Sequence, residues 1–314
     1  MRVLANLDDL PAGLRFVLVI GVFDGVHRGH QRVLGATVRA SRELAAQAVA
    51  LTFDPHPQAI LRGSSPPLLC DPAERLAHLA RLGMDATVVQ RFDRQFADQP
   101  PEAFLRRLAA DRELAGVVMT PESAFGRDRA GALATIESLA PSMGFRVVKV
   151  DHLTVAGAPI SSTRLRESLS RGRLADVWRL LGRRYAVVGE VVAGDRRGRA
   201  LGFPTANLRF DQPVALPPDG IYAVRVAWGG PDPLSPARRA DGVASLGIRP
   251  TFGGGARTLE VYLFDVDEEL YGQRLRLEFV RRQRGERRFA SPDALVRQME
   301  RDAARARVLL AANS

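Results

Sequence analysis

The feature that most constrains the fold is a change in the period of the apolar residues near residue 183. Before it, short and almost wholly apolar runs, such as Phe16–Val22 and Val49–Phe53, alternate with segments of helical periodicity. This alternation is typical of a parallel sheet covered by helices on both faces. After it, segments such as Leu275–Val280 alternate apolar and polar residues, which predicts half-buried antiparallel strands. We therefore expect an α/β domain followed by an all-β domain.

The first domain is expected at residues 1–183 as a doubly wound parallel sheet, whose ligands bind beyond the carboxyl ends of the strands. The second is expected at residues 184–314 as an antiparallel barrel, because closure removes exposed strand edges, with a C-terminal helix from Ser291. In the first domain we predict strands at 16–22, 49–53, 87–90, 115–119 and 145–150, and helices at 31–46, from 71 to before 83, 102–110 and 132–143. In the second we predict strands at 185–192, 221–228, 243–247, 259–264 and 275–280.

Composition narrows the possible chemistry. A chain of 314 residues is long enough for two domains. Cys70 is the only cysteine, which excludes an internal disulfide and a multi-cysteine zinc site. Asp8 and Asp9 precede the first apolar run, which is too short for a membrane span, so we expect a cytoplasmic protein with no membrane partner.

The basic residues carry a second constraint. The formal net charge is +10, and Lys149 is the only lysine among 45 basic residues. The GxxxxGK[ST] pattern is therefore absent from the sequence, so an ATP site here is not a Walker P-loop. The arginines suit phosphates but are scattered along the chain, which favours a solvated basic surface, and no nucleic-acid partner is expected.

All five histidines lie in the first half of the sequence, the last being His152. Histidine is the usual general base in enzymes. Acid–base chemistry in the second half therefore has to come from carboxylates or hydroxyls.

The segment Gly21–His30, GVFDGVHRGH, follows the first predicted strand and precedes the first predicted helix. Gly25 permits a tight turn, and Gly29 lets the chain approach a ligand closely. Free backbone N–H groups and the helix dipole favour a phosphate here. His27 and His30 are three residues apart, so both rings can face a phosphoryl group and stabilise its charge. A helix start without function and a metal site are the alternatives.

These ten residues resemble the signature of the nucleotidylyltransferase superfamily, which moves AMP from ATP to a phosphate acceptor, and they are most similar to its bacterial FAD synthetase branch. Residues 52–57, TFDPHP, resemble that branch's TFxPHP loop, and residues 160–166, ISSTRLR, resemble its [IV]SSTxIR motif. Alone, serine before a helix indicates only an N-cap. The resemblance implies catalytic His27 and His30; ATP contacts from Gly21, Phe23, Asp24, Gly29, His30, Ser161, Ser162, Thr163 and Arg166; and flavin contacts from Phe53, His56, Pro57, Phe125 and Gly126.

One loop departs from that branch. Residues 120–131, TPESAFGRDRAG, correspond to its GxDFxFGxxRxG-like loop, with Phe125 and Gly126 matching. Glu122 stands where Asp or Asn is usual, and Ser123 stands where Phe is usual. These departures could weaken the contacts of this loop to adenine or flavin and lower the efficiency of the adenylyl step.

In the second domain, residues 194–208 read GDRRGRALGFPTANL. The glycines predict a loop that wraps phosphates, Pro204 stiffens it, and Thr205 and Asn207 offer neutral oxygens suited to Mg²⁺. A generic Gly- and Arg-rich turn is the alternative. The run resembles the riboflavin kinase signature, as do DGIYA at 219–223, GIRPTF at 247–252 and LEVYLFD at 259–265.

That resemblance implies ATP contacts from Gly194, Gly198, Gly202, Pro204, Thr205 and Asn207, with Mg²⁺ at Thr205 and Asn207. It also implies that Glu260 is the base for the riboflavin 5′-hydroxyl. A solvent-facing residue of an alternating strand is the alternative for Glu260.

Over essentially its whole length the chain resembles the bifunctional riboflavin kinase/FAD synthetase family. The resemblance implies ATP as co-substrate, Mg²⁺ as cofactor, and riboflavin, FMN and FAD as substrates and products. Two alternatives remain: a riboflavin kinase with an impaired adenylyltransferase domain, and a non-catalytic flavin- or RNA-binding regulator.

Overall fold

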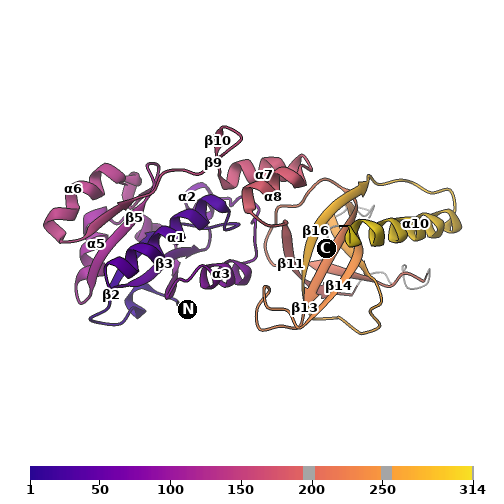
Figure 1. Ribbon diagram of the computed structural model, residues 1–314, viewed down its shortest axis with the longest axis horizontal. Helices are drawn as coiled ribbons and strands as arrows, with labels where there is room; N and C mark the ends of the chain where they lie inside the picture. The colour runs from indigo at the N-terminus through magenta and orange to yellow at the C-terminus, as the bar shows by residue number, and fades with distance from the viewer. Residues whose placement is uncertain (194–201, 249–256, 313–314) are drawn as a thin grey trace. The chain divides into compact units, whose positions relative to one another are not determined.

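The computed structural model describes residues 1–193, 202–248 and 257–312. The chain forms two compact units, Met1–Pro66 with Arg75–Ser161, and Pro67–Glu74 with Ser162–Ser314 (Figure 1). The domain boundary expected between residues 183 and 184 stays a prediction. Within the described ranges, every helix is too short or too polar to cross a membrane.

The first unit is built on a six-stranded parallel sheet with the order β1-β4-β3-β2-β5-β8. Its strands are β1 (Arg2–Leu4), β2 (Arg15–Ile20), β3 (Gln47–Asp54), β4 (Ala86–Arg91), β5 (Glu113–Met119) and β8 (Arg146–Lys149). The helices in this part of the chain are α1 (Arg28–Glu43), α2 (Pro57–Arg62), α3 (Pro72–Arg81), α4 (Arg94–Ala97), α5 (Pro101–Ala109) and α6 (Leu133–Met143). Short pieces complete it: η1 (Leu7–Asp9), β6 (Ala124–Phe125), η2 (Arg127–Arg129), β7 (Gly131–Ala132), β9 (Thr154–Val155) and β10 (Ala158–Pro159).

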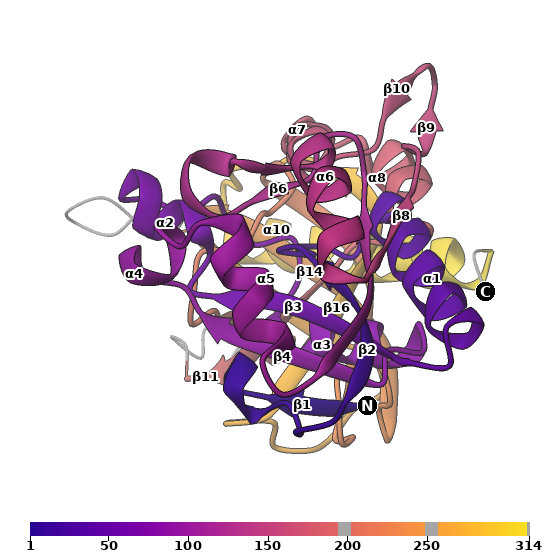
Figure 2. The same cartoon turned by 90° about the vertical axis from the view of Figure 1, so that its left-hand side faces the viewer.

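Both faces of this sheet are buried. Val17 and Val19 of β2 pack with residues of α1 and α3, whereas Phe16 and Leu18 pack with residues of α5 and α6 on the opposite face. Figure 2 shows α5 and α6 in front of the strands. Burial on both faces explains why the strands are almost free of polar residues, and the predicted doubly covered parallel sheet is confirmed.

Two of the differences from expectation have a clear physical reason. Helix α1 begins at Arg28 rather than Gln31, because the His27 ring caps it by accepting a hydrogen bond from the backbone N–H of His30. The edge strand β1 was not predicted, because three largely exposed residues have too little periodicity to reveal a strand.

The second unit contains a closed antiparallel barrel with the order β11-β12-β15-β14-β13-β16, which confirms the predicted closure. Its strands are β11 (Ala186–Val192), β12 (Thr205–Arg209), β13 (Gly220–Trp228), β14 (Arg238–Ile248), β15 (Arg257–Leu263) and β16 (Arg274–Arg284). Its helices are α7 (Ser162–Ser170), α8 (Leu174–Leu181) and α10 (Pro292–Ala311). Strand β12 was missed, since a five-residue strand directly after a Gly-rich run reads as part of that loop.

Alternation along the strands decides which side chains reach the barrel surface. In β15, Leu259, Val261 and Leu263 are buried, whereas the intervening Glu260 and Tyr262 are half-buried. On the outer face, Ala306 and Leu310 of α10 pack in one apolar cluster with residues of β13 and β16. Glu260 therefore projects outward, on the side of the barrel wall where ligands have access.

A segment from the first half of the sequence belongs to the barrel unit. The Leu68 N–H donates to the Pro213 carbonyl, and the Leu68 carbonyl accepts from the Ala215 N–H, both at 2.8 Å. Farther along, Asp71 pairs with Arg274 at 2.5 Å, and Glu74 pairs with Arg276 at 3.0 Å. These pairs join residues far apart in sequence, so local periodicity does not reveal them.

Candidate active sites

Most of the residues predicted for the adenylyltransferase site lie at the carboxyl edge of the parallel sheet. Strand β2 has β3 on one side and β5 on the other, which places a topological switch point at its end. The segments 21–30, 55–57 and 120–131 follow β2, β3 and β5, and all three therefore start from the same edge.

His27 and His30 lie face to face in that edge. Their rings stack with centroids 3.6 Å apart and planes inclined by 16°. The His27 ring is 4% exposed, and its Nδ1 accepts from the His30 N–H at 3.2 Å. Because Nδ1 is used as an acceptor, Nε2 is the nitrogen of His27 that carries the proton in the neutral ring. The pair presents imidazole donors at the N-terminus of α1, where a phosphate is favoured.

Gly29 allows the next segment to approach these rings. A Cβ atom placed on Gly29 would lie 3.1 Å from the His27 ring and 3.5 Å from the Ile160 carbonyl oxygen. The backbone before Ser161 therefore runs against the start of α1. This contact brings Ser161, the first polar residue of the ISST motif, to the histidine pair.

The turn between β2 and α1 is compact. Phe23 has a φ of +52°, and its ring lies 2.9 Å from the position that a Cβ of Gly21 would occupy. Phe23 also contacts the His30 ring edge to face, with centroids 5.4 Å apart. Asp24 is 3% exposed. Phe23 and Asp24 thus form the buried wall of this turn, and Gly21 leaves room for the Phe23 ring.

The predicted flavin residues divide into two groups. Phe53 and Phe125 are the two ends of a chain of ring contacts through Phe92, Phe96 and Phe104, with successive centroids 5.2 to 5.9 Å apart. Both rings thus pack in the core of the first unit. His56 caps α2 by accepting from the Gln58 N–H at 3.1 Å, and Pro57 is the first residue of α2.

In the loop 120–131, the residues that depart from the FAD synthetase branch make defined contacts. The Ser123 hydroxyl accepts from the Thr120 N–H at 2.9 Å and so closes the turn after β5. The Glu122 carboxylate contacts Nε2 of His152, which follows β8. Gly126 has a φ of +73°, and a Cβ there would lie 2.9 Å from the Gln99 carbonyl oxygen, so this position requires glycine. The sequence offered no signal for the Glu122–His152 pair, since 30 positions separate its members.

The remaining residues of the ISSTRLR motif belong to the second unit. Helix α7 begins at Ser162, and Thr163 is exposed in its first turn. The Arg166 guanidinium donates to the Pro67 carbonyl oxygen at 2.7 Å through Nε. A phosphate role for these three residues stays a prediction.

On the barrel, Glu260 lies on β15, the middle strand of three. It is paired in register with Asn207 of β12 on one side and Ser245 of β14 on the other. Directly paired residues of antiparallel strands point to the same face, so these polar side chains are neighbours. The Thr205 hydroxyl donates to Glu260 Oε2 at 3.3 Å. The structure therefore brings Glu260 together with Thr205 and Asn207 of β12, although Glu260 lies far from both in the sequence.

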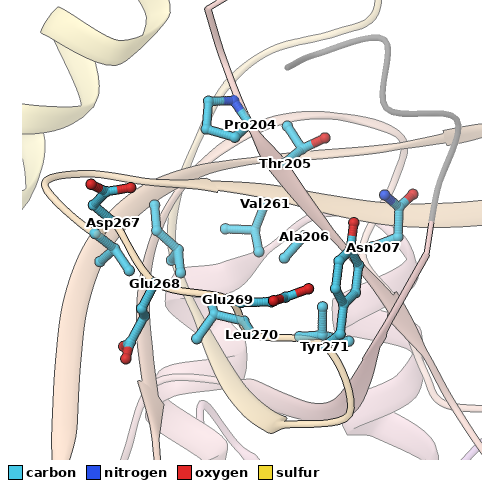
Figure 3. A pocket seen from close by; sticks show the side chains of 13 residues that line it. Pro204, Thr205, Ala206, Asn207, Val261, Asp267, Glu268, Glu269, Leu270 and Tyr271 are labelled. Carbon is cyan, nitrogen blue, oxygen red and sulfur yellow. The ribbon is translucent and has the colours of Figure 1, made fainter.

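Two cavities meet at Thr205. The first, of about 420 Å³, is lined by Pro204, Thr205 and Asn207 on one wall and by the segment 267–271 opposite, as Figure 3 shows. Gly202, with a φ of +82°, forms the exposed turn before this wall. Gly194 and Gly198 lie outside the described residues.

The second cavity, of about 410 Å³, lies between the outer face of the barrel and α10. It is lined by Glu260 and Thr205, by the aromatic side chains Phe203, Tyr262 and Phe289, and by Met299 of α10. Sequence reasoning missed this cavity, because its walls come from segments separated by up to about a hundred residues. The one signal in the sequence was the alternation of apolar and polar residues along β15, which predicts that Tyr262 and Glu260 point to the same face.

An ion pair fixes α10 at the second cavity. Arg284 contacts Asp302 through Nε and Nη2 at distances of 2.6 to 3.1 Å, and both side chains are largely buried. Gln298 donates to Asp302 Oδ1 at 2.9 Å. The network holds the helix that forms one wall of the cavity.

Asp302→Asn is expected to lower the free energy of unfolding by about 3 kcal/mol, because it leaves the buried Arg284 charge unpaired. Urea denaturation of the intact chain measures this. Replacing both partners, as in Arg284→Met with Asp302→Leu, should cost less than the single change, and a larger loss would contradict the explanation.

The exposed pair Arg307–Asp265 is the matched control, and Asp265→Asn should lower the free energy of unfolding far less than Asp302→Asn near neutral pH. The hydrogen bond from Arg307 lowers the pKa of Asp265 in the folded state. Any stabilisation from this pair is therefore present above the ordinary pKa of an aspartate and is lost as the pH falls through the lowered value.

Comparisons with known proteins match both halves of the chain. A family model described as FAD synthetase matches residues 12–164, and one described as riboflavin kinase matches residues 181–310. A bifunctional riboflavin kinase/FMN adenylyltransferase from Escherichia coli (strain K12) is 36% identical over 309 residues, covering 98% of this chain and 96% of that protein. The protein of the same name from Listeria monocytogenes is 34% identical, covering 91% of this chain and 90% of the relative.

A solved structure agrees over the whole length. The crystal structure of a macrolide-efflux protein from Streptococcus pneumoniae matches with a TM-score of 0.82 and 30% identity, covering 96% of each chain. The two family models and the full-length relatives lead to one conclusion. The chain belongs to the family of bifunctional riboflavin kinase/FMN adenylyltransferases, and it is a transferase with both activities.

Proposed function

We propose that the barrel unit phosphorylates riboflavin to FMN and that the histidine pair of the first unit serves the adenylylation of FMN to FAD. The observation that carries the proposal is the position of Glu260 and Thr205, hydrogen-bonded to each other where two cavities meet. A kinase needs this arrangement, because a base must reach the acceptor hydroxyl while the phosphate approaches from the other side.

In the kinase reaction, Glu260 accepts the proton of the riboflavin 5′-hydroxyl. The hydroxyl oxygen then forms a bond to the γ-phosphorus, the bond from that phosphorus to the β-bridging oxygen breaks, and ADP leaves. The Thr205 hydroxyl holds Glu260 in place in the free protein. Aromatic side chains and Met299 in the second cavity suit the isoalloxazine ring, and the first cavity takes the nucleotide.

The residues at this junction fit Mg²⁺. Oxygen donors are the ligands that Mg²⁺ prefers, and Thr205 and Asn207 offer neutral oxygens beside the Glu260 carboxylate. Thr205 and Asn207 would hold the ion. Bound there, it would neutralise charge on the transferring phosphate.

In the adenylyl reaction, a phosphate oxygen of FMN forms a bond to the α-phosphorus of ATP, and pyrophosphate leaves. His27 and His30 position this phosphorus and stabilise the charge that develops on its oxygens. Gly21, Phe23, Asp24, Gly29 and Ser161 surround the nucleotide. We propose small-molecule substrates and a cytoplasmic site of action.

Gly29→Ala is expected to lower FAD formation by about 10-fold, because the added methyl presses on the His27 ring and displacement of a catalytic group is costly. Discontinuous assays with FMN and ATP measure this. Gly35→Ala is the matched control in the same helix, since a Cβ there meets only the Arg39 side chain at 3.6 Å. Equal losses in both variants would show a general helix effect.

Product analysis with riboflavin, ATP and Mg²⁺ tests the whole proposal. Both FMN and FAD are expected. FMN without FAD would favour a kinase with an impaired adenylyltransferase domain, for which the contact of Glu122 with His152 is the specific observation. Absence of turnover with strong salt-dependent RNA binding would favour the regulator.

A further inference from the structure

The barrel unit has a third cleft, of about 630 Å³, where α8 packs against β16. Within the described residues, it shares no lining residue with either cavity at Thr205. Its floor is apolar and includes Tyr185 and Phe279, whose rings stack with centroids 6.2 Å apart. Neither proposed reaction uses this cleft.

The cleft is strongly basic. Four arginines line it, and the described residues that line it include no carboxylate. Arg184 lies 3.6 Å from Glu278, which also pairs with Arg276 at 3.5 Å, and Arg282 donates to the Asp219 carbonyl oxygen at 2.5 Å. Because the described lining holds four arginines and no carboxylate, the lining residues carry a net positive charge.

The other two of these four arginines, Arg173 and Arg281, are exposed. In the described part of the chain, neither side chain forms an ion pair or a hydrogen bond. Arg179, on α8, differs from these two arginines. It pairs with Asp176 at 3.1 Å and does not line the cleft. Arg173 and Arg281 therefore remain available to an anion, which the arginine fork binds well.

Trp178 supplies a flat apolar surface to the same cleft. Its side chain is 54% exposed, whereas Val177 and Leu180, its neighbours on α8, are buried. Trp178 lines the cleft together with the arginines. An exposed tryptophan among arginines offers ring stacking and charge-assisted hydrogen bonds at one place.

We propose that this cleft binds a nucleotide, with the planar ring on Trp178 and the phosphates on Arg173 and Arg281. A free phosphate would leave the tryptophan surface unused. The cleft has the volume of an ordinary small-ligand pocket, which favours a single nucleotide over a nucleic-acid strand. The chain thus has a nucleotide site separate from the two sites that carry out transfer, and this site goes beyond the proposed function.

Intrinsic fluorescence provides a specific test. The chain has two tryptophans, and the second, Trp228, is 6% exposed, so Trp228→Phe leaves Trp178 as the only reporter. ADP is titrated while fluorescence is excited at the red edge of the tryptophan band, where adenine does not absorb. Adenosine and pyrophosphate are titrated separately. Saturable quenching by ADP is expected, with much weaker effects of adenosine and pyrophosphate.

Charge variants locate the binding. In the Trp228→Phe background, Arg173→Glu with Arg281→Glu should weaken ADP quenching at least about 10-fold, since two charge-assisted contacts are lost. The milder Arg281→Gln should weaken it about threefold. Arg305→Glu is the matched control, because Arg305 is exposed on α10 and lines none of the described cavities. Unchanged riboflavin phosphorylation confirms that each variant is folded and leaves the proposed function untouched.

Equilibrium dialysis with FMN, compared with ADP, determines whether flavin or adenine nucleotides are preferred. Absence of ADP quenching, or equal quenching in the arginine variants and Arg305→Glu, would overturn the proposal. Quenching by a single-stranded RNA oligonucleotide but by neither ADP nor FMN would also overturn it, and would identify a nucleic-acid surface instead.

Discussion

His30→Ala is expected to reduce FAD formation from FMN and ATP at least about 100-fold, and to leave riboflavin phosphorylation unchanged. Loss of one donor to a developing oxyanion typically costs about 10² to 10³ in kcat. In the proposed mechanism, His30 and His27 act on one position, because their stacked ring centroids lie 3.6 Å apart. The reaction is followed by chromatography of the flavin products.

The kinase activity of the same variant is the internal control, because Glu260 and Thr205 lie in the other unit. His78→Ala is the matched histidine control in α3, and it should retain FAD formation. Equal loss of FMN and FAD formation in His30→Ala would disprove the division of labour between the two units.

Glu260→Gln is expected to lower riboflavin phosphorylation at least about 100-fold, the low end of general-base contributions. The amide keeps the shape of the side chain and still accepts from the Thr205 hydroxyl, but it does not accept a proton. The loss should therefore appear in kcat rather than in KM for riboflavin. Initial rates of FMN formation with saturating ATP and Mg²⁺ measure both constants.

Glu190→Gln is the matched control on the barrel surface. Glu190 pairs with Arg209 at 2.5 Å and lines neither cavity at Thr205, so the same chemical change there should leave turnover intact. Near-normal turnover in Glu260→Gln would mean that the base lies elsewhere. FAD formation from supplied FMN should be normal in both variants.

Much of the fold follows from local pattern. Runs such as Phe16–Ile20 are apolar at every position because the sheet is buried on both faces, and this distinguishes them from the alternating Leu275–Val280. Strand β12 could not be predicted in this way. Its five residues, Thr205–Arg209, are mostly half-buried and show no apolar–polar alternation that distinguishes them from the preceding loop.

The sequence alone predicted the two fold classes, the histidine pair at a helix start, and the need for a carboxylate or hydroxyl as the base in the second half. These depend on period, spacing and residue type, which are local properties. Only the tertiary structure decided that Glu260 meets Thr205 between two cavities, and that Glu122 pairs with His152. Strand pairing and burial create these contacts, and they join residues whose separation in the chain leaves no local trace.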